Sequence, residues 1–162
     1  MAEPKKVIDI PDGVGWLESA EPELLRAIHD RADYVSLPAG RAYSRAGDES
    51  GGLSAVVSGR IDLHLPSVRE GRTLVYAFGP GWWIGDLSAI SEQERFFDHV
   101  TAQPTKLLRL SKREMERLCQ DFPETWKRLA RMATANMRVA IKVAARNRLE
   151  NPTARVASTL PP

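Results

Sequence analysis

The sequence is poor in the features that cross-link small domains or anchor a chain in a membrane. Cys119 is the single cysteine, which excludes an intramolecular disulfide, a zinc site built from cysteines and a cysteine-held iron–sulfur cluster. No apolar run approaches the length of about 18 residues that a membrane-spanning helix needs, and the first residues lead into no apolar stretch like that of a signal peptide. These absences predict a cytoplasmic protein with no metal site and no membrane partner.

Motifs that mark common enzymes are also missing. The sequence contains no nucleophile elbow, no HExxH motif and no phosphate-binding P-loop, so we assign no catalytic residue and expect no enzymatic activity. Basic residues concentrate near the end: residues 1–121 carry 15 basic and 19 acidic side chains, whereas residues 122–162 carry 8 and 2. Because aromatic residues do not alternate with these basic ones, the basic segment is interpreted as a solvated helix face rather than a nucleic-acid groove.

The hydrophobic pattern changes its period twice along the chain of 162 residues. Helical spacing over residues 16–32 predicts a short helical lead. Between residues 34 and 110, short apolar runs separated by glycine or proline predict many short strands in a rolled or barrel-like antiparallel sheet. Residues 111–114 form a Ser-x-x-Glu capping box that starts a short helix, and from residue 121 a helical pattern continues to residue 150. The predicted fold class is therefore α+β.

The long helix carries two adjoining apolar stripes. One stripe consists of Leu129, Met132, Asn136, Val139 and Val143. The other consists of Trp126, Ala130, Ala133, Met137, Ala140 and Ala144. A helix that is apolar over so wide an arc must be covered on both sides, by the sheet and by the same helix of a second subunit in a parallel pair. The predicted homodimer interface contains Leu129, Met132, Ala133, Asn136, Val139, Ala140 and Val143. A helix packed wholly within one subunit is the alternative.

Residues 79–89 contain the most informative motif. Two glycine turns are followed by Gly85 and Asp86, which lead into one helical turn containing Leu87 and Ser88. Backbone amides at a helix start bind phosphate, a carboxylate there accepts from a ribose hydroxyl, and an arginine nearby neutralises the phosphate. Asp86 and Arg95 fit the last two roles. Alternatively, the Gly-Asp pair is only a turn and Arg95 a surface cation.

The order of these motifs resembles the Crp/Fnr family of regulators, typified by the cyclic AMP receptor protein. The resemblance covers nearly the whole chain and is carried by the glycines at positions 40, 47, 59 and 71, residues 79–86, the long helix and the Asn-Pro-Thr-Ala-Arg sequence from residue 151. It implies a β-roll of the jelly-roll, cyclic nucleotide-binding type over residues 1–120 and a dimerisation helix over residues 121–150. It also implies a hinge and the truncated start of a helix-turn-helix domain over residues 151–162.

The phosphate-binding cassette departs from the cyclic-AMP-binding members of this family. Those members carry glycine-glutamate, then arginine and serine or threonine, whereas this chain has Asp86 and then Arg95 followed by Phe96. Arg95 aligns with the family arginine only if one residue is deleted, and without that gap Phe96 takes its place. Either register loses the hydroxyl. Where the receptor contacts adenine with a polar pair, this chain has Ala140 and Ile141.

The resemblance therefore implies a ligand site whose effector is not cyclic AMP, or binds it only weakly. Its candidate residues are Gly85, Asp86, Leu87, Ser88, Arg95, Phe96, Ala140 and Ile141. A weakly bound cyclic nucleotide or another small effector stays open, and no cofactor is assigned. We interpret the chain as the ligand-sensing and dimerisation module of a bacterial transcription regulator, which contacts DNA only if the missing C-terminal domain is present. The alternative is a stand-alone protein-interaction module.

Overall fold

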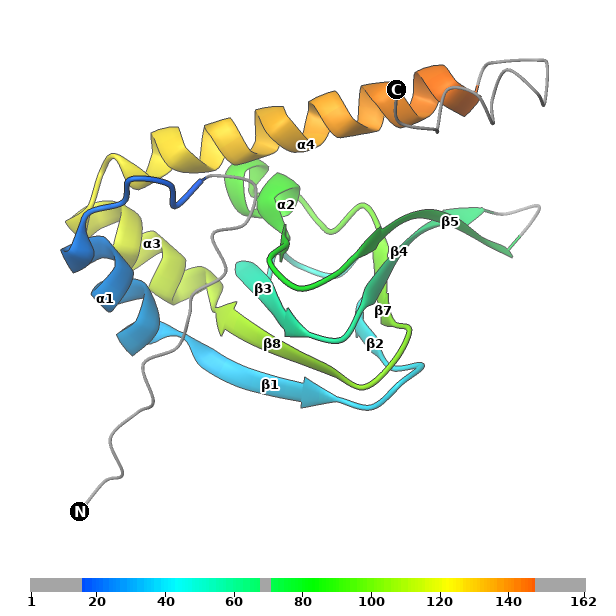
Figure 1. Ribbon diagram of the computed structural model, residues 1–162, viewed down its shortest axis with the longest axis horizontal. Coiled ribbons are helices and arrows are strands. Elements are labelled where there is room, and N and C mark those ends of the chain that lie inside the picture. The colour runs from blue at the N-terminus through cyan, green and yellow to red at the C-terminus, as the bar shows by residue number, and fades with distance from the viewer. Residues whose placement is uncertain (1–15, 68–70, 148–162) are drawn as a thin grey trace, which may run out of the picture.

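The computed structural model describes residues 16–67 and 71–147 and contains two four-stranded antiparallel sheets with flanking helices (Figure 1). One sheet has the strand order β1-β8-β3-β6 and the other β2-β7-β4-β5. The strands are β1 (Asp33–Leu37), β2 (Ala42–Ser44), β3 (Leu53–Ser58), β4 (Ile61–Ser67), β5 (Gly71–Phe78), β6 (Trp83–Ile84), β7 (Asp98–Thr101) and β8 (Thr105–Leu110). The helices are α1 (Pro22–Arg31), α2 (Asp86–Ser91), α3 (Lys112–Asp121) and α4 (Thr125–Asn147). The predicted α+β fold, an antiparallel β-roll with flanking helices and a long C-terminal helix, is confirmed.

Two groups of buried apolar side chains hold these elements together. The first joins the two sheets, with Val56, Ile84 and Leu107 on one and Ile61 on the other, each at most 2% exposed. The second group joins α1, α3 and α4 to the first sheet, and its largest members include Trp16, Trp83, Leu24, Ile28, Leu108, Leu118, Leu129 and Met132. Figure 1 shows the result: α1 and α3 cover one end of the roll, and α4 runs along its side past α2.

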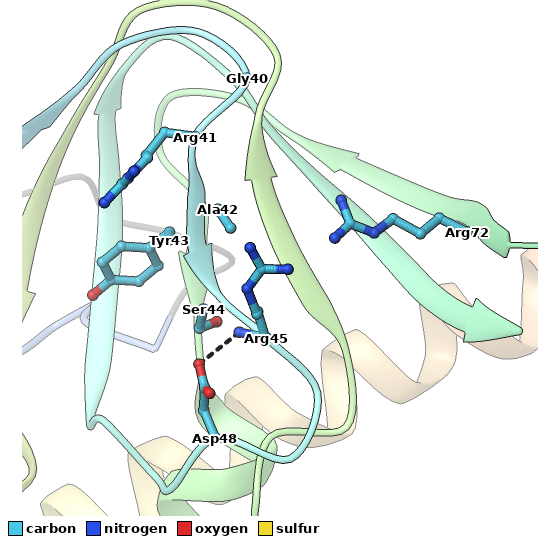
Figure 2. Close-up of a pocket in the computed structure, with 8 residues that line it drawn as sticks. All are labelled: Gly40, Arg41, Ala42, Tyr43, Ser44, Arg45, Asp48 and Arg72. Atoms are coloured by element: carbon cyan, nitrogen blue, oxygen red, sulfur yellow. Dashed lines mark hydrogen bonds between the residues drawn. The ribbon is translucent and has the colours of Figure 1, made fainter.

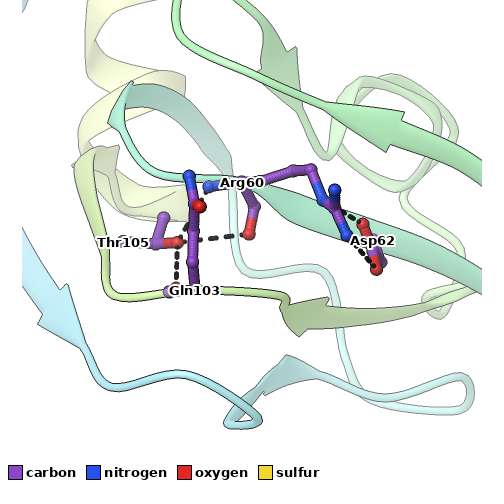
Figure 3. Close-up of polar contacts among 4 residues, drawn as sticks. All are labelled: Arg60, Asp62, Gln103 and Thr105. Atoms are coloured by element: carbon purple, nitrogen blue, oxygen red, sulfur yellow. Dashed lines mark hydrogen bonds and ion pairs between the residues drawn. The ribbon is translucent and has the colours of Figure 1, made fainter.

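The turn between β3 and β4 is held against the turn between β7 and β8 (Figure 3). Gly59 has a φ of +90°, and a Cβ atom there would lie 2.5 Å from the carbonyl oxygen of Pro104, so only glycine fits. Thr105 Oγ1 accepts a hydrogen bond from the backbone amide of Arg60 at 3.1 Å and donates to the carbonyl oxygen of Gln103 at 2.7 Å. These contacts fix where the two strand pairs meet.

The helical lead begins later than its hydrophobic spacing predicts. The helix predicted over residues 16–32 starts only at Pro22, because proline is favoured in the first turn of a helix and residues 16–19 form turns, with Ser19 at a φ of +54°. Trp16 is nevertheless only 1% exposed. Arg128 of α4 holds this segment by donating to the carbonyl oxygens of Glu18 at 2.9 Å and Ser19 at 3.0 Å.

The start of α3 follows the predicted capping box. The Ser111 side chain accepts a hydrogen bond from the backbone amide of Glu114 at 3.3 Å. The long helix is present as α4. Its predicted last turn lies outside the described residues, as do the hinge and the truncated start of a helix-turn-helix domain predicted over residues 151–162. No helix within the described part of the chain is both long and apolar enough to span a membrane.

The two apolar stripes of α4 are present, but the structure corrects which of them is covered by the chain itself. Leu129 and Met132, predicted at the dimer interface, are 0% and 1% exposed within the core of their own chain. Asn136 also faces inward, where it donates to Asp86. Leu129 and Met132 are therefore unavailable to a partner, because α4 packs this part of the stripe on its own roll.

The second stripe of α4 lies on the open side of the helix. Trp126 and Met137 of this stripe are 43% and 58% exposed, and the neighbouring Ile141 is 60% exposed. The other residues predicted at the interface are exposed or partly exposed: Ala133, Val139, Ala140 and Val143. The uncovered surface of α4 therefore follows residues 126, 130, 133, 137, 140 and 144, which are spaced in alternating steps of four and three.

Candidate functional site

The site is built around the sharp entry into α2. Gly85 precedes this helix with a φ of +97°, which an L side chain rarely adopts. A Cβ atom at this position would lie 2.5 Å from the carbonyl oxygen of Gly52 and 2.6 Å from Nη1 of Arg95. The glycine is required because a second loop and a guanidinium group pack directly on the backbone at this point.

Arg95 is the cation of this site. Only 6% of the residue is exposed, and its Nη2 donates to the carbonyl oxygen of Gly52 at 3.4 Å. Nη1 is buried and, among the described residues, has no hydrogen-bond partner. Burial lowers the pKa of the Arg95 guanidinium, and this shift is opposed by Tyr43, Asp48 and Asp86. A buried guanidinium with an unused donor is suited to an anion.

Backbone hydrogen bonds fix which residue occupies the arginine position. The amide of Arg95 donates to the carbonyl oxygen of Asp48 at 2.7 Å, and the amide of Gly47 donates to the carbonyl oxygen of Arg95 at 2.8 Å. Phe96 is 65% exposed. Of the two registers left open by the sequence, the structure thus supports the one with the deletion, in which Arg95 lies beside Gly85.

The acidic residue of the cassette is already bonded to the long helix. Asp86 is 7% exposed, and its Oδ2 accepts a hydrogen bond from Asn136 Nδ2 at 2.8 Å. Burial raises the pKa of the Asp86 carboxyl, whereas hydrogen bonds from Asn136 and from the backbone, together with the charge of Arg95, oppose that rise. One of the two carboxylate oxygens of Asp86 is therefore engaged by a side chain of α4.

The remaining predicted site residues offer few polar groups to a ligand. Ser88 is buried, and its hydroxyl donates to the carbonyl oxygen of Gly85 at 3.2 Å within α2. Leu87 is 55% exposed, and Ala140 and Ile141 are exposed on α4, with no side-chain group that hydrogen-bonds a base. The structure thus brings Gly85, Asp86 and Arg95 together, while Phe96 lies outside this polar cluster.

Two contributions to the site were not predicted from the sequence. Asn136 contacts the cassette, although the sequence places it at the dimer seam. The sequence feature that indicates this contact is the helical spacing of Asn136 with Leu129 and Met132, which places all three on the same face of α4. The second contribution is the pair Gly51 and Gly52, against which Arg95 packs: a Cβ atom on Gly51 would lie 2.9 Å from Nη2 of Arg95. Adjacent glycines before a strand are the signal for such a close approach.

A buried histidine is close enough to Arg95 to be affected by its charge. His99 is 5% exposed, and its Nδ1 lies 2.9 Å from the Ser44 hydroxyl. Burial, and secondly the charge of Arg95, lower the pKa of His99 to about 3, although Asp98 opposes the shift. His99 is therefore neutral at physiological pH, which leaves Arg95 as the positive charge of this interior.

Comparisons with known proteins agree with the fold. Residues 34–122 match the family model of the cyclic nucleotide-binding domain. The catabolite activator protein of Thermus thermophilus has a similar structure, with a TM-score of 0.70 and 22% identity over 81% of this chain and 63% of that chain. A cyclic nucleotide-binding-like protein from Brucella abortus gives a TM-score of 0.58 and 30% identity over 65% of this chain and 90% of that chain.

Curated relatives are much longer than this chain. Lysophospholipase nte1 of Neurospora crassa is 28% identical over 120 residues, which are 74% of this chain and 8% of that protein. The chain thus spans a small part of the length of this relative.

Proposed function

The chain belongs to the cyclic nucleotide-binding domain family, and from this premise we propose that it is the ligand-sensing and dimerisation module of a cytoplasmic Crp/Fnr-type transcription regulator. In this proposal residues 1–120 form the sensor, residues 121–150 the dimerisation helix, and residues 151–162 the hinge to a DNA-binding domain. The observation that carries it is the hydrogen bond between Asn136 and Asp86. This bond joins the cassette to α4, whose opposite stripe is uncovered.

Dimerisation through α4 is the second part of the proposal. The uncovered stripe has the alternating spacing of a two-stranded parallel coiled coil, and its alanines permit close approach of two helices. Trp126 and Met137 supply apolar bulk that a partner helix would remove from water. A ligand that changes the bond between Asp86 and Asn136 would shift the position of α4, and thereby the geometry of the pair.

The effector is a small anionic molecule, and cyclic AMP binds weakly or not at all. Arg95 offers a buried guanidinium with a free donor, which favours an anion. Asp86 is one methylene shorter than the family glutamate and is bonded to Asn136. The hydroxyl that follows the family arginine is replaced by the exposed ring of Phe96. A cyclic nucleotide would therefore lose hydrogen bonds at the ribose and at the phosphate.

A thermal melt of the full chain with cyclic AMP tests the effector assignment. Ligand at about a hundred times its dissociation constant stabilises a protein by roughly 2.7 kcal/mol, which is several degrees for a chain of this size. We expect an unchanged melting temperature at millimolar cyclic AMP. A rise of several degrees would show that Asp86 and Arg95 still bind the nucleotide, and would overturn this part of the proposal.

A regulatory module of a larger protein without DNA binding is the second candidate function. It is favoured by the lysophospholipase relative, of which the chain covers 8%. The codons that follow residue 162 in the gene distinguish the two. A helix-turn-helix sequence there supports the transcription regulator, and any other domain supports the second candidate. A stop codon there supports the stand-alone protein-interaction module instead.

A further inference from the structure

A polar cavity lies along β2, next to the loop that contacts the backbone of Arg95. It has a volume of about 380 Å³ and is lined by the strand and the loop that follows it, together with Arg72 from β5 (Figure 2). Asp98 on β7 contacts Arg72, whereas the next residue, His99, is the one influenced by Arg95. The backbone amide of Arg95 donates to the carbonyl oxygen of Asp48, so Arg95 is adjacent to this cavity but does not line it.

Two guanidinium groups converge on this cavity. Figure 2 shows the guanidinium groups of Arg45 and Arg72 turned toward each other, with Arg41 turned away. Asp48 is the acidic residue of the lining, and its Oδ2 accepts from the backbone amide of Arg45 at 2.7 Å. Within the described residues, the Arg45 side chain forms no ion pair. Two like charges that face each other repel, and an anion between them would remove that repulsion.

A buried carboxylate holds one of the two arginines in place. Asp98 is 6% exposed; its Oδ2 lies 3.0 Å from Nε of Arg72, and its Oδ1 accepts from the backbone amide of Ala46 at 2.9 Å. Because Asp98 takes the Nε side of the guanidinium, the two Nη groups are left for the cavity. A guanidinium fixed in this way is a planar two-donor group that matches the oxygen atoms of phosphate.

We propose that this cavity, the Arg45–Arg72 site, binds the phosphate group of a phosphorylated molecule. Two converging guanidinium groups suit a doubly charged oxyanion better than a single carboxylate. The cavity of about 380 Å³ is larger than a phosphate ion, so the organic part of the ligand has room beside it. The site uses no residue of the cassette, and it does not depend on the proposed effector.

Titration of the full chain with glycerol phosphate in chloride buffer, followed by amide NMR shifts, tests the site. We expect saturable shifts for residues 40–48 and 72, and we expect Arg45→Gln and Arg72→Gln each to weaken binding about tenfold or more, as loss of a charged hydrogen bond predicts. Arg60→Gln is the matched control, because Arg60 is an exposed arginine of the turn before β4, a strand of the same sheet as β2 and β5, and it pairs with Asp62 at 2.9 Å. It should bind like the wild type.

Vesicles that contain phosphatidic acid form the second arm of this experiment. Vesicle binding that needs Arg45 and Arg72, without binding of glycerol phosphate, would support the site and assign the phosphate to a lipid headgroup. The proposal is overturned if neither probe binds at millimolar phosphate, if Arg60→Gln weakens binding as much as the other two variants, or if the shifts map to Gly85 and Asp86 instead. Chemical shifts of unliganded Arg45→Gln and Arg72→Gln that match the wild type away from the site establish that the variants are folded.

Discussion

His99 is buried near the charge of Arg95 and is therefore neutral at physiological pH. Its burial makes the stability of the folded protein sensitive to acid. Its pKa falls from an ordinary 6.5 to about 3 because the side chain is buried, and because protonation would add a second positive charge next to the guanidinium. Between those two pH values the unfolded chain binds a proton at this position and the folded chain does not. Stability supplied by neutral His99 is thus complete above pH 6.5 and is lost as the pH falls toward 3.

His99→Gln is expected to flatten the acid side of the stability profile. Between pH 6.5 and pH 5 the wild type should lose roughly 2 kcal/mol of unfolding free energy through this histidine, since each pH unit within the window costs about 1.4 kcal/mol. Urea denaturation of both proteins at several pH values measures the difference. Parallel profiles for the two proteins would contradict a buried, neutral His99.

Only those residues of the site that belong to a recognisable local motif could be predicted from the sequence. Gly85 and Asp86 follow from the motif, because a glycine followed by an acid at a helix start is a local pattern. The register of Arg95 was not predictable, because it depends on backbone hydrogen bonds to Gly47 and Asp48 in a loop distant in sequence. Asn136 was assigned to the wrong contact for the same reason: its partner Asp86 is 50 residues away.

Among the secondary-structure elements, α4 is the helix with two apolar faces described above. Its inner stripe belongs to the core shared with α1 and α3, and its outer stripe is uncovered. Periodicity predicts both stripes but does not say which one faces the roll, since both are apolar. The arrangement is decided by what the roll offers: a buried carboxylate for Asn136 and an apolar pocket for Leu129 and Met132.

Leu129→Ala is expected to destabilise the subunit without affecting association. The side chain is fully buried, so its truncation should lower the unfolding free energy by about 2 to 5 kcal/mol. Thr134→Ala, at an exposed position of the same helix, is the control and should change stability by less than about 0.5 kcal/mol. Urea denaturation of each variant, at the same protein concentration, measures the difference in unfolding free energy. If Leu129→Ala instead dissociates the protein while leaving its stability intact, the inner and outer stripes are reversed.

For the molecule as a whole, the sequence predicts the architecture better than the assembly. Glycine-punctuated strands, a capping box and an unbroken helical pattern are local signals, and the roll with its flanking helices follows from them. Which surface is left for a second copy depends on how α4 is rotated against the roll, and only the packed structure defines that angle. The exposed stripe around Trp126 and Met137 is therefore a feature of the subunit fold that also determines how two subunits would assemble.

Sedimentation velocity of the purified chain at micromolar concentration tests the central claim that α4 pairs with its copy. We expect a species of twice the 18.0 kDa mass of one chain. Met137→Glu should reduce it to a single copy that keeps its fold by circular dichroism, because two carboxylates would face each other across a parallel seam. A wild-type protein that sediments at 18.0 kDa under these conditions would contradict the account.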